Sequence, residues 1–175
     1  AVQYGAEFQR VVETAERFGN AVIAIRGHAD PTKTLLELVK AGTKKGVLKR
    51  SGSRGNYRYA LQGRALDLNA TQRLVELITA GSFDGVSDFN PRETMQAALN
   101  LSRKRAEAVL QSIVQYAQGK GLGIDQSQIQ PTGVGIREPF IAKPTSMDEA
   151  RQNMRVEFRV IRVPAEATVE SDFDF

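Results

Sequence analysis

The sequence predicts a single α+β domain in which helices pack on one face of a small mixed sheet. Two observations lead to this prediction. Apolar residues recur at helical spacing in four segments, and three short runs have the β-branched or alternating pattern of strands. A chain of 175 residues buries about two thirds of the surface that its unfolded form exposes, so its core needs no disulfide or metal.

The chain is expected to open with a helix and a buried strand. Apolar residues within positions 4–18 have helical spacing and alternate with charged residues, which predicts an amphipathic helix. The segment AVIAIRG at 21–27 is rich in β-branched residues and predicts a central strand. Thr32 or Thr34 is then expected to cap a second helix that ends at Gly42.

The middle of the chain is expected to be a loop followed by two helices. The loop covers about residues 42–56. Asn69 and Gln72 have capping-box spacing at the start of a third helix, and Gly81 is its expected end. A long fourth helix is predicted over about residues 92–118. Its core-facing stripe is expected to consist of Leu101, Ala108, Leu110, Ile113, Val114 and Ala117.

Two further strands are predicted near the end of the chain. One covers about residues 129–134, and the other lies in RVEFRVIRV at 155–163. In the latter, Val156, Phe158 and Val160 are expected to face one side, while the charged residues between them face the other.

Charge is unevenly distributed along the chain. The whole sequence has 24 Lys and Arg against 20 Asp and Glu, but residues 31–64 contain nine basic residues and one acidic residue, Glu37. This stretch is either a patch for nucleic acid or another anionic polymer, or a solvated loop. Four acidic residues without a basic partner predict a mobile tail over about residues 164–175.

The composition excludes several kinds of site. The absence of cysteine excludes zinc-cysteine clusters, iron-sulfur ligation, thiol nucleophiles and disulfides. His28 is the only histidine and would need distant carboxylates to hold a metal, so neither a metal nor another cofactor is expected. The longest apolar run, at 21–25, is far shorter than the roughly 20 residues that span a bilayer. Because the chain opens inside the first expected helix, it is expected to be a fragment of a longer protein.

One carboxylate and one guanidinium are expected at the same rim of the sheet. Asp30 follows the first strand, and Arg105 lies on the long helix. The two residues could form a structural salt bridge, or they could form a binding site for a ligand that carries both charges. The sequence around both residues favours the second interpretation.

Four segments resemble motifs of one protein family. IAIRGHADP resembles a strand-and-loop motif G-H-T-D, and NLSRKRAEAV resembles a helix motif in which Asn precedes L-S-x-x-R-A. GVGIREP resembles a turn G-Y-G-E-x-x-P, and ARQNMRVEFRV resembles a closing strand R-x-x-N-R-R-V-E. These motifs, in this order, are typical of the OmpA-like peptidoglycan-binding domain. The resemblance implies a βαβαββ-type sandwich.

The resemblance also implies a ligand and the residues that bind it. Asp30 would accept hydrogen bonds from the ammonium of diaminopimelate in the peptidoglycan stem peptide, and Arg105 would hold its carboxylate. Arg151 and Asn153 would support the pocket, and Asn100 is a further candidate for contact with the ligand.

The resemblance implies that the chain is a non-catalytic module that anchors a larger cell-envelope protein to peptidoglycan in the periplasm. Its partners would be the stem peptide and the membrane-anchoring region of the parent protein. Nucleic acid is not expected as a partner, and the possibility of a homodimer stays open. The alternative is binding of nucleic acid or another anionic polymer through the basic stretch. A third hypothesis, a cell-wall enzyme that uses Asp30 and Glu138 as an acid and base, lacks a motif for the second carboxylate.

The chain departs from the family pattern in several places. Ala98 stands where the helix motif usually has Asn, and Met154 replaces one of the paired arginines. The family's first strand has no counterpart ahead of Tyr4. The segment YALQGRA offers Arg64 as a competing ligand, but its spacing fits the helix motif less well.

The largest departure is an insertion. Asp30 and Arg105 are 75 positions apart (105 − 30), whereas the family connects the two motifs briefly. We expect residues 31–92 to form an inserted helical subdomain within one domain that covers residues 1–175.

Overall fold

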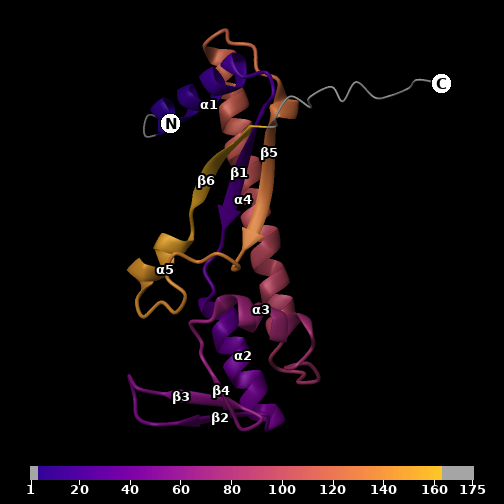
Figure 1. Ribbon diagram of the computed structural model, residues 1–175, viewed down its shortest axis with the longest axis vertical. Helices are drawn as coiled ribbons and strands as arrows, with labels where there is room; N and C mark the ends of the chain where they lie inside the picture. The colour runs from indigo at the N-terminus through magenta and orange to yellow at the C-terminus, as the bar shows by residue number, and fades with distance from the viewer. Residues whose placement is uncertain (1–3, 163–175) are drawn as a thin grey trace, which may run out of the picture.

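A computed structural model describes residues 4–162 and has an α+β fold (Figure 1). The central sheet has the strand order β5-β1-β6, with β1 at Ala21–His28, β5 at Ile129–Gly135 and β6 at Val156–Arg162. Strand β5 is parallel to β1, whereas β6 is antiparallel to it. The predicted small mixed sheet is therefore confirmed. The proposed acidic tail lies outside the described residues.

Two helices cover the apolar core of this sheet. Helix α1 (Gly5–Arg17) packs against β1 and α4 (Pro91–Gly119), and α4 packs against β1 and β5. This first core consists of Phe8, Val11, Val12, Ala15, Ile23, Ile25, Ala106, Ile113, Ala117 and Ile129.

Helix α4 lies unusually close to the sheet because glycines face it. A Cβ atom on Gly27 would collide with the carbonyl oxygen of Ser102, and one on Gly133 would lie 2.9 Å from the carbonyl oxygen of Leu99. The buried Ser102 hydroxyl uses this proximity: it accepts a hydrogen bond from the Gly135 backbone N–H at 2.9 Å and donates to Leu99 at 2.8 Å. The close approach fixes α4 against β1 and β5.

A second core lies at the opposite end of the molecule from α1 (Figure 1). It is formed by α2 (Thr32–Lys45), α3 (Thr71–Thr79) and an antiparallel sheet of β2 (Leu48–Ser51), β3 (Arg58–Leu61) and β4 (Arg64–Leu66). Its buried members are Leu38, Ala41, Leu48, Leu68, Leu74, Leu77, Ile78 and Phe83, with Met95 of α4 packed beside them. Helix α4 therefore contributes to both cores.

The insertion was expected to be helical, and it contains α2 and α3 but also the sheet of β2, β3 and β4. Helix α2 continues through Gly42 to Lys45, and β2 occupies part of the expected loop. Gly42 lies inside the helix, where its lack of a side chain lets Leu48 pack closely. A Cβ there would lie 2.7 Å from the Leu48 side chain. Gly46, with φ of 79°, ends the helix instead.

Several smaller predictions are wrong. Thr32, Thr34 and Asn69 do not cap helices, since the N-cap positions are Pro31 and Ala70, without side-chain caps. On the expected apolar faces, Tyr4, Leu36, Leu101, Ala108 and Val160 are exposed. Helix α5 (Met147–Asn153) was not predicted, because seven mostly polar residues show no apolar stripe.

Within residues 4–162, the structure has no helix that is both long and apolar enough to cross a membrane.

We predict that Gly27→Ala destabilises the fold by about 1 to 3 kcal/mol, because the added methyl group must push α4 away from β1. Chemical denaturation measures the free energy of unfolding. Gly119→Ala is the matched control, since a Cβ on Gly119 meets no atom within 4 Å. Equal effects of the two substitutions would contradict the close packing of α4 on the sheet.

Candidate functional site

Asp30 lies just beyond the end of β1 and is held by two hydrogen bonds. Its Oδ2 accepts from the Thr32 backbone N–H at 3.0 Å, and its Oδ1 accepts from the Asn153 amide at 2.9 Å. Both donors are neutral, so they orient the carboxylate without cancelling its charge. Each carboxylate oxygen has a further lone pair with which it can accept a hydrogen bond.

Asn153 is the buried residue that fixes the position of Asp30. It ends α5, its side chain is fully buried, and its amide also bonds both backbone groups of Ile141 at 2.8 and 2.9 Å. The same amide therefore connects the loop after β5 to the carboxylate at the end of β1. The family resemblance implied Asn153 as a support of the ligand pocket, and the structure shows that it bonds Asp30.

Arg105 reaches the same region from α4. Its Nη1 donates to the His28 backbone carbonyl at 3.1 Å. A guanidinium has five N–H donors, so one bond to a carbonyl leaves most of the planar group available. Among the described ion pairs none joins Asp30 to Arg105, which argues against the interpretation of these residues as a structural salt bridge.

The two charged residues line one pocket of about 320 Å³, at the boundary between the two cores. Its other polar lining residues are Lys33, Thr34 and Thr94, and its apolar walls come from Ala29, Ala97, Ala98, Leu101 and Met154. The α4 residues of the pocket have helical spacing and form one stripe along that helix.

Three of the five expected site residues do not line this pocket: Asn153, which bonds Asp30, and also Asn100 and Arg151. Asn100 is exposed and accepts a hydrogen bond from the Gln96 amide at 3.0 Å. The side chain of Arg151 is 71% exposed and lies 3.2 Å from the Asp148 carboxylate. The structure thus brings together Asp30, Arg105 and Asn153, and it leaves the other two outside.

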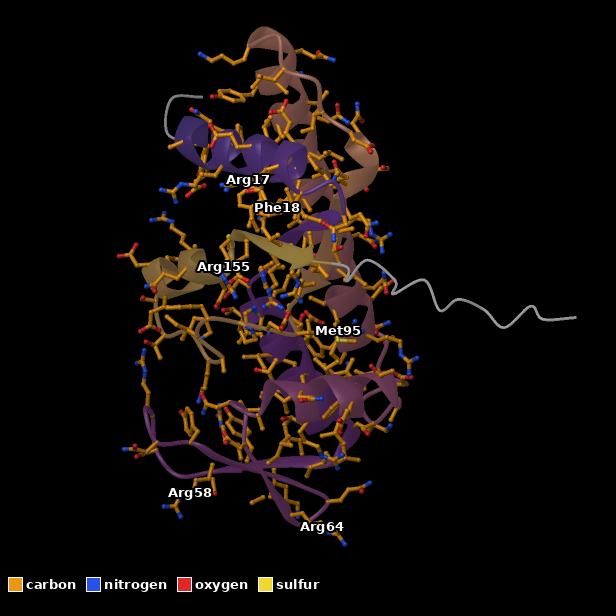
Figure 2. All side chains as sticks on the ribbon, turned by 45° about the horizontal axis from the view of Figure 1, so that its top comes forward. Arg17, Phe18, Arg58, Arg64, Met95 and Arg155 are labelled. Carbon is orange, nitrogen blue, oxygen red and sulfur yellow. The ribbon has the colours of Figure 1, made fainter. Side chains whose placement is uncertain are left out.

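Arg64, the competing arginine, lies on a strand and not on a helix. It belongs to β4 and lines a different cavity, of about 830 Å³, in the second core region. Figure 2 shows Arg64 and Arg58 on the small sheet, at the opposite end of the molecule from Arg17.

Sequence reasoning missed Lys33 and Thr34 as lining residues. Both lie in the first turn of α2, which begins two residues after Asp30. A helix that starts so close to a site residue must place its first turn beside the site. The predicted start of that helix therefore indicated that Lys33 and Thr34 lie beside Asp30.

His28 points to the face of the sheet opposite α4 and is fully buried. Its Nε2 lies 3.4 Å from Glu157 Oε2, but neither ring nitrogen makes a hydrogen bond in the described structure. Burial lowers the pKa of His28 below its ordinary value of 6.5, and the positive charge of Arg155 lowers it further, while Glu157 opposes the shift. Arg26 and Glu138 complete the charged surroundings, with a smaller lowering from the former and a smaller raising from the latter.

Glu138 has a structural partner and does not line the Asp30 pocket. It pairs with Arg26, and the hydrogen bond from that guanidinium lowers the pKa of the Glu138 carboxyl. A general acid needs a raised pKa, so this environment does not favour the acid and base pair that the sequence left open. Over residues 4–162 there is also no group of three or more potential metal ligands.

No family model, curated protein or solved structure matches the chain.

The buried histidine predicts a pH dependence of stability. Because the pKa of His28 is lower in the folded protein, the unfolded chain binds more protons between the two pKa values. Stability should therefore fall as the pH is lowered from about 7 to 5.5, with a slope of at most about 1.4 kcal/mol per pH unit from this group.

His28→Asn should flatten this slope, since His28 is the only histidine of the chain. Denaturation curves at several pH values measure both proteins. An identical slope in the variant would show that His28 does not cause the dependence.

Proposed function

We propose that the chain binds peptidoglycan non-covalently through the diaminopimelate of the stem peptide. The observation that supports this most is the common pocket of Asp30 and Arg105, two residues 75 positions apart that line it without forming an ion pair. The four sequence motifs that resemble the OmpA-like domain support the same ligand.

The charges of the pocket suit an amino-acid end group. The Asp30 carboxylate, oriented by Asn153, would accept from the ligand's ammonium. The unused N–H groups of Arg105 would hold the neighbouring carboxylate through a bidentate fork. A neutral side chain would leave both protein charges without a partner, so the pocket discriminates against it.

Two departures from the family pattern lie on the walls of the pocket. Ala98 and Met154 both line it, so an apolar surface occupies positions where the family has polar side chains. Binding would then depend more strongly on Asp30, Arg105 and the residues that α2 supplies.

The proposed role is anchoring, without catalysis. A module of this kind would attach a larger cell-envelope protein to the cell wall in the periplasm. The pocket hydroxyls of Thr34 and Thr94 have no imidazole beside them, because His28 lies on the other face of the sheet. No imidazole therefore lines the described pocket to serve as the base for either hydroxyl.

A second candidate function is supported by the surface of β2–β4. Seven basic residues and no acidic residue occur between positions 44 and 64. In the described structure, Lys44 alone among them forms an ion pair, with Asp88, and Arg50 stacks on Tyr57 at 4.2 Å. Cations without acidic partners favour an anionic polymer. The remaining members are Lys45, Lys49, Arg54, Arg58 and Arg64.

We predict that Asp30→Asn and Arg105→Ala each weaken binding of a diaminopimelate-containing stem peptide by at least about 25-fold. Truncation of one member of a desolvated charge pair costs about 2 to 5 kcal/mol, and each 1.4 kcal/mol is about tenfold in Kd. Isothermal titration calorimetry measures the affinity. Asp30→Asn keeps one side-chain oxygen as acceptor, and circular dichroism checks that both variants are folded.

Arg64→Ala is the matched control and should leave this affinity unchanged, because Arg64 lines a different cavity. Sedimentation with whole sacculi at low and high salt extends the test. Association that falls steeply with salt, depends on Arg64 and survives Asp30→Asn would favour the anionic-polymer function instead.

A further inference from the structure

The first turn of α2 adds two polar side chains to the pocket. Lys33 and Thr34 line it together with Asp30 and Arg105. They belong to the inserted segment, and so they lie outside the four motifs on which the proposed function depends.

Thr34 is a buried hydroxyl without a partner. The residue is 1% exposed, and its Oγ1 makes no hydrogen bond in the described structure. A buried polar group left unpaired costs free energy, unless a ligand supplies the missing partner. Thr34 is therefore placed to bond a ligand group that enters the pocket.

Lys33 gives the pocket an excess of positive charge. The residue is exposed, and no described ion pair includes it. Its ammonium and the Arg105 guanidinium carry two positive charges, against the one negative charge of Asp30. A ligand with one ammonium and one carboxylate would balance Asp30 and Arg105, and it would leave Lys33 without a counterion.

We propose that Lys33 and Thr34 form a subsite for a second carboxylate, so that the pocket selects a ligand with one ammonium and two carboxylates. This inference rests on the proposed function. A stem peptide that ends at diaminopimelate has these groups, because one amine of that residue is in the peptide bond and both carboxylates are free. A further alanine joined to the stem converts one diaminopimelate carboxylate into an amide and places a new carboxylate one residue further along, away from the position that the subsite would hold.

The test compares two synthetic stem peptides, a tripeptide that ends at diaminopimelate and the tetrapeptide with one further alanine. The wild-type protein should bind the tripeptide at least about tenfold more tightly, because a hydrogen bond to a charged group alone contributes about that factor and the solvent-exposed ion pair adds to it. Isothermal titration calorimetry gives the ratio of the two affinities.

The variants Lys33→Met and Thr34→Val should each reduce this ratio toward one, mainly by weakening the tripeptide. Lys33→Met keeps the length of the side chain and removes its charge. Thr34→Val keeps its shape and removes the unpaired hydroxyl, so the variant should fold at least as stably as the wild type. Lys40→Met is the control, because Lys40 lies on the same helix but lines another cavity, next to Phe89.

The possible results separate the two proposals. Equal wild-type affinities for both peptides, or a ratio that persists in Lys33→Met and Thr34→Val, would overturn the subsite while the proposed function stands. A wild-type protein that binds neither peptide would overturn both. A ratio that falls in these two variants but not in Lys40→Met supports the subsite.

Discussion

The contact between α4 and the glycines of β1 and β5 is the constraint on which the rest of the structure depends. It presses the backbone of Ser102 against Gly27 and lets the Ser102 hydroxyl bond β5 directly. One turn further along the helix, Arg105 reaches the His28 carbonyl at the end of β1. Since the N-terminal part of α4 also packs in the second core, this one helix sets the distance between the two cores and thus the size of the pocket between them.

A second set of polar contacts holds the other side of the pocket. Asn153 fixes Asp30 and the loop at Ile141 from a fully buried position, and on the opposite face of the sheet Arg155 pairs with Glu157 behind His28. These groups keep β6, the loop after β5 and the end of β1 in register. The Asp30 carboxylate is thereby already oriented in the protein alone, which would reduce the ordering cost of the proposed binding.

The elements that could be predicted from the sequence are those whose apolar residues have strong periodicity. The central strands and α1, α2, α3 and α4 were predicted, because their apolar patterns extend over many residues. Strands β2, β3 and β4 were missed because they have four residues or fewer, too short for a visible alternation, and lie in a basic, glycine-rich stretch. Motif resemblance pointed to Asp30, Arg105 and Asn153 as candidate site residues. Asn100 was expected at the same site but lies outside the pocket, because it is one residue, about 100° of helical turn, from Leu101 in the pocket stripe.

The central claim is that a ligand binds where the two cores meet, between the end of β1, the start of α2 and the middle of α4. Titration of the isotopically labelled protein with the stem tripeptide, followed by amide chemical shifts in NMR spectra, tests it most directly. The account predicts the largest shift changes at residues 29–34 and along 94–105, with smaller changes near Ile141 and Asn153. Changes confined to residues 48–66 of the small sheet would contradict it.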